Sequence, residues 1–349
     1  MKVGTARAAA ADWVARYAAQ QDDFIGAYFI GSTKNLPDDD ALPPQSDIDV
    51  VVVISDQVAP LKPGKILHNG ALIEITLIPL QRLSSVDEVL ADYHLAPGLE
   101  VNTIIADPTG HLRGLQSNVA CHFAEEAVVR KRCRNALEKI ETSLRQLDVS
   151  TAWPDLVLDW LFPTGVVTHV LLVAALQNPT VRLRYLRVRE VLHEYGLIGL
   201  YTDLLRLLGC AEMTAQQVED QLHILSKTFD AAAGVARTKF PFSTDITPAA
   251  RSIAIDGSRS LIEAGNHREA VFWIVATSAR CHKILAADAA PEVQLEFAPS
   301  FGEVLAGIGI SSPDDVLRRA AVVLQFLPQL WTAAEVIIAA NPGIERTSH

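Results

Sequence analysis

Cysteine is scarce in this sequence, and the few cysteines are not arranged as a disulfide or zinc framework. The 349 residues include four cysteines, which lie far apart in the chain and form no Cys-x-x-Cys pair (Cys121, Cys133, Cys210 and Cys281). The ten histidines include no His-Glu-x-x-His motif. We therefore expect a protein of the reducing cytoplasm, with the thiols as small buried side chains and without a structural zinc ion.

Long uninterrupted apolar runs are also missing, although 49% of the residues are hydrophobic. The nearest candidate, residues 165–176, contains His169 and is shorter than the roughly eighteen residues that a spanning helix needs. Near the N-terminus, Asp12 and Arg16 interrupt any apolar segment of the kind found in signal peptides. We therefore expect a globular protein with a large core and no membrane partner.

Positive charge is not in excess. The sequence has 30 Lys and Arg residues against 41 Asp and Glu residues, which gives a formal net charge of −11. Proteins that bind nucleic acid present basic surfaces to the phosphate backbone. Nucleic acid is therefore not expected as a partner, whereas a cationic small molecule is compatible with this charge.

The pattern of apolar residues changes about one third of the way along the chain. Apolar and β-branched runs predict strands in residues 24–30, 47–55, 70–80 and 99–110, and residues 84–93 predict a helix with an N-terminal serine cap. From residue 117 apolar residues recur at helical spacing without a breaker, and from 151 helix follows helix, divided by Pro and Gly. We predict an α+β fold with a mixed-sheet domain at 1–117 and an all-α helical-bundle domain at 118–349.

Three acidic residues stand at unusual positions in the predicted sheet. Asp47 and Asp49 occur one residue apart at the start of an aliphatic strand, so their side chains point to the same side. Glu74 lies inside the apolar run of a later strand, where a carboxylate is costly unless it is paired or bound to a metal. If the two strands are neighbours, the three acids can hold two Mg²⁺ ions and orient a phosphoryl group for in-line displacement.

A Gly-Ser pair follows the first predicted strand. Gly31 permits close approach of the backbone, and Ser32 offers both a hydroxyl and a backbone N–H. Where a strand gives way to a loop or helix, such a pair can form a phosphate cradle.

The set FIGS, SDIDVVVV and IEITLI (29–32, 46–53 and 73–78) resembles the polymerase-beta-like nucleotidyltransferase superfamily. Within it, the chain looks most like the aminoglycoside adenylyltransferases of the kanamycin and the streptomycin/spectinomycin kinds, which join a nucleotidyltransferase domain to a helical C-terminal domain. The resemblance implies an antibiotic-modifying adenylyltransferase that uses ATP as co-substrate, Mg²⁺ as cofactor and a hydroxyl of an amino sugar as acceptor. It also implies, by analogy alone, a homodimer.

The resemblance assigns roles to five residues. It implies that Asp47 and Asp49 bind magnesium and that Ser32, with the Gly31 backbone, holds the nucleoside triphosphate. It implies that Glu74 is a metal ligand or the general base. All three acids are therefore candidate catalytic and metal-binding residues.

One departure from the family pattern is the long loop 33–45, which contains two Pro clusters and three consecutive aspartates. It leaves open whether Thr33 and Lys34 contact phosphate. We expect Asp38, Asp39 and Asp40 to form a solvated loop tip.

Three other functions stay open. The first is a toxin-type nucleotidyltransferase that modifies a protein or RNA. The second is a ribonuclease activity in the helical half, because residues 187–196 (RVREVLHEYG) resemble the motif of HEPN domains, although an ordinary amphipathic helix explains the same pattern. The third is a module that only binds nucleotide. Basic residues of the helical half could reach a triphosphate, and the sequence does not select among them (Lys239, Arg251, Arg259 and Arg280).

Overall fold

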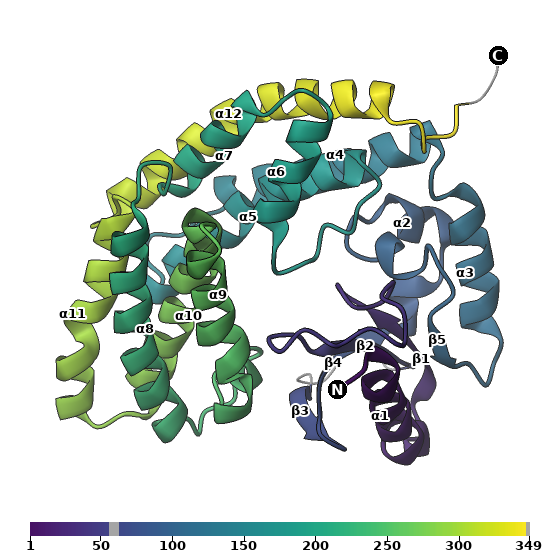
Figure 1. The fold of residues 1–349 in the computed structure, drawn as a ribbon, viewed down its shortest axis with the longest axis horizontal. Coiled ribbons are helices and arrows are strands. Elements are labelled where there is room, and N and C mark those ends of the chain that lie inside the picture. The colour runs from purple at the N-terminus through teal and green to yellow at the C-terminus, as the bar shows by residue number, and fades with distance from the viewer. Residues whose placement is uncertain (56–62, 347–349) are drawn as a thin grey trace. The chain divides into compact units, whose positions relative to one another are not determined.

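The computed structural model describes residues 1–55 and 63–346, and the expected α+β class is confirmed in them (Figure 1). The chain divides into two compact units. Unit 1 comprises residues 1–135, 173–182 and 341–349, and unit 2 comprises residues 136–172 and 183–340. Each unit is described below by itself.

Unit 1 contains a five-stranded mixed sheet in the order β3-β4-β2-β1-β5. The central strands β2 and β4 run parallel, and the other neighbours are antiparallel. Strands β1, β2 and β4 lie where the sequence predicts them, β5 covers only three residues in the middle of the predicted run 99–110, and β3 was not predicted. The strands span β1 (Phe24–Ile30), β2 (Ile48–Ile54), β3 (Gly64–His68), β4 (Ala71–Pro79) and β5 (Ile104–Ala106).

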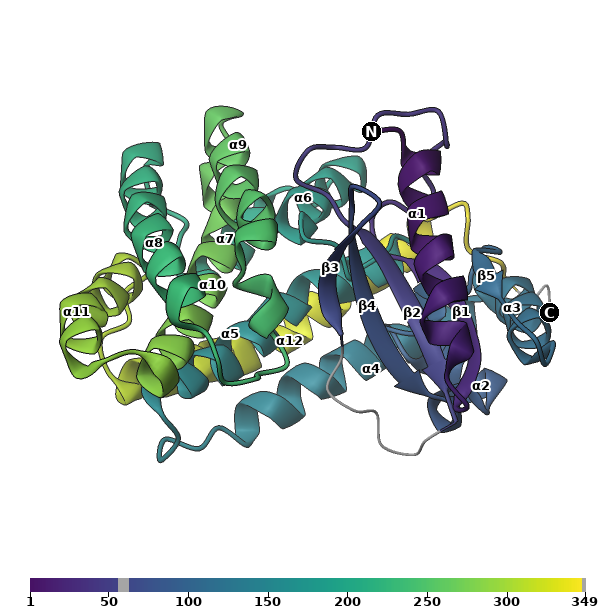
Figure 2. The ribbon, with the colours of Figure 1, turned by 90° about the horizontal axis from the view of Figure 1, so that it is seen from below.

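Both faces of the sheet are buried under helices, which explains the almost unbroken aliphatic sequence of β2. Helix α1 (Val3–Arg16) covers one face (Figure 2), where its alanines pack against alternate residues of β2 that include Val50 and Val52. The intervening residues, Val51 and Val53, lie in a second core on the opposite face. Because side chains alternate, Asp49 belongs to that second face.

The second face is covered by α2 (Val86–Ala91) and α3 (His111–His122). As predicted, α2 has a serine N-cap, because the Ser85 hydroxyl accepts a hydrogen bond from the Glu88 amide. The predicted domain boundary after residue 117 falls inside α3, whose apolar residues pack into the second core. The sheet-containing unit therefore extends further along the chain than the predicted domain.

The long helix predicted from residue 117 is interrupted. Helix α3 ends at His122, and α4 (Glu126–Arg145) begins after a short turn. The C-terminal segment binds this turn, because the Glu345 amide donates to Ala124 and the Glu345 carbonyl accepts from the Glu126 amide. No breaker marks the interruption in the sequence, since its partner lies more than 200 residues away.

Unit 2 is all-α in its described residues. Its central helices α8, α9 and α10 lie side by side, with α11 against α8 and α10 (Figures 1 and 2). Pro163, Pro299 and Pro328 lie inside helices, whereas the sequence suggested proline as a divider between helices. The helices after α4 are α5 (Trp153–Ala174), α6 (Arg184–Glu194), α7 (Gly199–Leu208), α8 (Ala215–Val235), α9 (Gly257–Glu263), α10 (His267–Asp288), α11 (Pro291–Gly307) and α12 (Pro313–Ala340).

Two of the described helices, α5 and α12, are long and apolar enough to cross a membrane by length and composition. In α5, 89% of the most apolar window is buried inside the protein, and in α12 the share is 39%. A buried core helix of a soluble protein meets the same criteria. The apolar run considered in the sequence, residues 165–176, lies mostly in α5. The absence of a membrane partner stays a prediction.

The cysteines follow the expectation with one exception. Cys133, Cys210 and Cys281 are buried and form no disulfide, and burial raises the pKa of the Cys210 thiol to about 12. Cys121 is free but exposed, on α3, so the expectation of a buried thiol is wrong for this residue.

Candidate metal and nucleotide site

The three acidic residues singled out in the sequence lie together in unit 1. Asp47 immediately precedes β2, Asp49 is the second residue of β2, and Glu74 is paired with Asp49 in the parallel β2–β4 ladder. One carboxylate oxygen from each residue lies within 4.8 Å of the others. Strands β2 and β4 are therefore neighbours, as expected, and their pairing brings the three side chains into one cluster. Their roles in metal binding and catalysis stay predictions.

The pleat of the sheet explains this cluster. Asp47 and Asp49 are two residues apart and share a face, and directly paired residues of neighbouring strands share a face as well. Asp49 is the only residue of β2 that is not fully buried. The carboxylates therefore stand on the face of the sheet away from α1, at the edge of its second apolar core.

Gly31 is required by the position of Asp49. Ile30, the last residue of β1, is paired with Asp49, so the chain turns directly beside that carboxylate. Gly31 has a φ of +79°, and a Cβ added to it would lie 1.9 Å from the Asp49 Oδ2 atom. Only a residue without a side chain permits this approach. Ser32 follows in the same turn with its side chain exposed, and its contact with a triphosphate stays a prediction.

Two polar side chains hold this turn, and neither was predicted from the sequence. The Arg7 guanidinium of α1 donates to the carbonyls of Thr33, at 2.5 Å, and Lys34, at 2.9 Å. The Asn178 side-chain amide donates to the Gly31 carbonyl at 3.1 Å. Asn178 lies in the segment 173–182, which comes from the predicted helical domain but belongs to unit 1. An Asn-Pro-Thr turn is visible in the sequence there, but nothing local connects it to Gly31.

The structure places Thr33 and Lys34 in the protein interior. Both are buried, and the Lys34 ammonium forms an ion pair with Glu100 at 3.3 Å and donates to the Pro97 carbonyl. Burial lowers the pKa of Lys34, and the Glu100 carboxylate opposes this shift. The Lys34 ammonium is therefore engaged away from the carboxylate cluster, which argues against the phosphate contact that the sequence left open.

The aspartate run in the long loop is exposed, as expected, but it also fastens the loop to α1. Asp38 forms an ion pair with Arg7 at 2.6 Å, and Asp39 forms one with Lys2 at 2.8 Å. The backbone carbonyls of Asp38 and Asp40 accept hydrogen bonds from the first residues of α1. These contacts hold the loop against the N-terminal end of α1.

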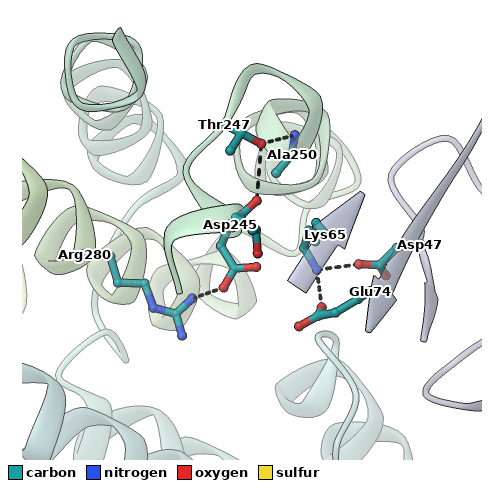
Figure 3. Close-up of polar contacts among 8 residues, drawn as sticks. Asp47, Lys65, Glu74, Asp245, Thr247, Ala250 and Arg280 are labelled. Atoms are coloured by element: carbon teal, nitrogen blue, oxygen red, sulfur yellow. Dashed lines mark hydrogen bonds and ion pairs between the residues drawn. The ribbon is translucent and has the colours of Figure 1, made fainter. Parts of the chain in front are cut away.

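A fourth charged residue, Lys65, lies within the carboxylate cluster (Figure 3). It is paired with Glu74 in the antiparallel β3–β4 ladder, so Asp49, Glu74 and Lys65 form one row across three strands. The Lys65 ammonium lies 2.5 Å from the Asp47 Oδ2 atom and also forms an ion pair with Glu74. Lys65 was not predicted from the sequence, because its strand β3 was not recognised there. Three of the five residues of β3 are half-exposed.

The donor set fits a hard divalent cation. All three candidate ligands are carboxylates, and Mg²⁺ prefers oxygen ligands at about 2.1 Å, so two ligands on opposite sides of the ion lie about 4.2 Å apart. The three carboxylate oxygens lie within 4.8 Å of one another, and small side-chain rotations bring them to the separation that the ion requires. The Lys65 ammonium shows that the cluster accommodates a cation in contact with two of its carboxylates.

The two arginines of the segment that suggested a nuclease form ion pairs within unit 2. Arg189 forms an ion pair with Glu269 at 2.6 Å and donates to Asn266, while Arg187 pairs with Glu190 one turn further along α6. His193 is exposed. These contacts favour the ordinary-helix interpretation of residues 187–196.

The basic residues considered as triphosphate ligands also lie in unit 2. Arg251 forms an ion pair with Asp230 at 2.8 Å, and Arg280 pairs with Asp245 at 3.1 Å (Figure 3). Lys239 and Arg259 are exposed. The contact of any of them with a triphosphate stays a prediction.

Comparison with known proteins adds no assignment, since no protein-family model and no curated protein matches the chain. The chemistry of the site is therefore inferred from its own residues and geometry.

Proposed function

We propose that the protein is a Mg²⁺-dependent nucleotidyltransferase that transfers AMP from ATP to a hydroxyl group of a small molecule. The observation that carries the proposal is the cluster of Asp47, Asp49 and Glu74 beside the Gly31 turn. The mixed sheet is compatible with the fold of the polymerase-beta-like nucleotidyltransferases, which the sequence motifs resemble.

In this proposal the chain supplies a cradle and a set of ligands. Asp47 and Asp49 hold the metal, and Ser32 with the Gly31 backbone binds the triphosphate. When bound, Mg²⁺ offsets the negative charge that develops on the transferred phosphoryl group and on the departing pyrophosphate. The turn is preorganised for this task, because Arg7 and Asn178 fix its carbonyls.

Glu74, on β4, can act in two ways. It completes the metal site, or it accepts the proton from the attacking hydroxyl as general base. In either task the acceptor oxygen forms a bond to the α-phosphorus of ATP while the bond to the pyrophosphate oxygen breaks. The acidic cluster and the net charge of −11 favour a cationic acceptor, and an aminoglycoside-like amino sugar is the class that the resemblance suggests.

The test is pyrophosphate release from ATP and Mg²⁺ across a panel of aminoglycosides and aminocyclitols. The proposal predicts release that requires one class of acceptor and falls at least about a thousandfold in Asp49→Asn, because a metal ligand is lost. Asp39→Asn is the matched control, since it removes one carboxylate charge from an exposed position of the same unit. Equal loss in both variants contradicts a specific role for Asp49. ATP binding without release for any acceptor favours the binding module instead.

A further inference from the structure

Lys65 is a charged residue of unit 1 that lies outside the predicted set but inside the carboxylate cluster. Its side chain is only 9% exposed, and its ammonium contacts Asp47 and Glu74 in the candidate metal cluster. A buried ammonium is costly unless it is paired and hydrogen-bonded. The position of Lys65 therefore depends on the carboxylates around it.

The dependence is mutual. Three carboxylates with oxygens within 4.8 Å repel one another unless positive charge lies between them. Lys65 supplies one positive charge to this group from the neighbouring strand, fixed in register opposite Glu74. A divalent cation that enters the cluster competes with the Lys65 ammonium for the same oxygens of Asp47 and Glu74.

We propose that Lys65 is a resident cation of the carboxylate cluster, which must leave Asp47 and Glu74 when a divalent metal ion enters. Exchange of a single charge for a double charge favours the metal, but displacement of a buried ammonium opposes it. Lys65 therefore weakens the binding of a free metal ion. A polyanionic ligand offers the displaced ammonium a new partner, so metal entry is coupled to the arrival of the triphosphate. This last step, unlike the competition itself, rests on the proposed function.

The competition is tested by Mn²⁺ binding in calorimetry with the full chain and without nucleotide. In Lys65→Met the affinity for Mn²⁺ rises at least about tenfold, because the competing cation is gone. Lys34→Met is the matched control, since it removes a buried lysine of the same unit that pairs with Glu100 and not with the cluster. Unchanged or weaker Mn²⁺ binding in folded Lys65→Met overturns the proposal, as does an equal rise in both variants.

A measurement on the unaltered protein covers the case in which Lys65→Met does not fold. Amine-specific labelling, read by mass spectrometry of peptides, is compared with and without Mg²⁺ and a non-hydrolysable ATP analogue. The proposal predicts that Lys65 is protected in the metal-free protein and becomes labelled several-fold faster on addition of Mg²⁺, while Lys34 stays protected throughout. Addition of the analogue slows labelling of Lys65 again if the displaced ammonium pairs with the triphosphate. Labelling of Lys65 that does not respond to Mg²⁺ overturns the proposal.

Neither readout requires turnover, so the two proposals can fail independently. If Lys65→Met binds Mn²⁺ more tightly and the unaltered protein releases no pyrophosphate, the resident-cation proposal holds and the transferase proposal fails. If the unaltered protein releases pyrophosphate and Lys65→Met binds Mn²⁺ with unchanged affinity, the transferase proposal holds and the resident-cation proposal fails.

Discussion

Replacement of Gly31 by alanine should disable the carboxylate cluster while leaving most of the protein folded. The added Cβ would lie 1.9 Å from the Asp49 Oδ2 atom and 2.6 Å from its Cγ atom, well inside van der Waals contact. The Asp49 side chain must therefore move by more than about 1 Å, which exceeds the displacement of about 0.5 Å that a functional site tolerates. Alanine at a φ of +79° adds strain of about 1–2 kcal/mol.

Gly110→Ala separates these two effects. Gly110 has nearly the same φ, +77°, and a Cβ added there meets nothing within 4 Å. Both variants should lose about 1–2 kcal/mol of unfolding free energy from backbone strain, measured by denaturant titration. Only Gly31→Ala should also weaken Mn²⁺ binding, by at least about tenfold, which corresponds to about 1.4 kcal/mol. Equal Mn²⁺ affinities in the two variants would refute the argument that Gly31 makes room for Asp49.

Three further predictions concern residues that the sequence did not single out. Asn178→Ala removes the donor to the Gly31 carbonyl and should cost about 1 kcal/mol of unfolding free energy. It should also raise the Kd for ATP several-fold, measured by calorimetry. An unchanged Kd would show that the turn keeps its position without Asn178. Arg7→Met leaves the Thr33 and Lys34 carbonyls without the guanidinium donor and should lower the unfolding free energy by about 1–3 kcal/mol. A loss below about 0.5 kcal/mol, roughly the scatter for surface substitutions, would contradict the role assigned to Arg7. Burial lowers the pKa of His282 from 6.5 to about 4, so the unfolded chain binds a proton in this range while the folded chain does not, and stability falls as the pH decreases from 6.5 to about 4. This group should make the protein about 2 kcal/mol less stable at pH 5 than at pH 7, and denaturant titrations of His282→Gln should show a pH dependence smaller by that amount.

The strands that carry the acids were predictable because each is a local pattern. The apolar run of β2 begins at an Asp-x-Asp pair, and β4 contains a single acid in an otherwise apolar segment. Strand β3 was not predicted because it has only five residues, which show no clear alternation of buried and exposed positions. The break between α3 and α4 was missed for a different reason, since a segment more than 200 residues later stabilises it.

The acidic residues of the candidate site were predictable for the same reason, whereas the residues that position them were not. Asp47, Asp49 and Glu74 show a chemical pattern along the chain, and strand pairing brings them together. Lys65 and Asn178 reach the same site only through tertiary structure, from an unrecognised strand and from a segment assigned to the other domain. Linear motifs therefore identify the groups that carry charge, and the fold is needed to find the groups that hold them.

The most direct test of the central claim is the identity of the group that reaches the acceptor. Mass spectrometry of the acceptor panel after incubation with the protein, ATP and Mg²⁺ should find one class of amino sugar that carries a single AMP, with pyrophosphate released in equal amount. The product should disappear in Asp49→Asn and persist in Asp39→Asn. An acceptor that gains a phosphate with release of ADP would contradict the account, and so would formation of the AMP product in Asp49→Asn at the rate of the unaltered protein.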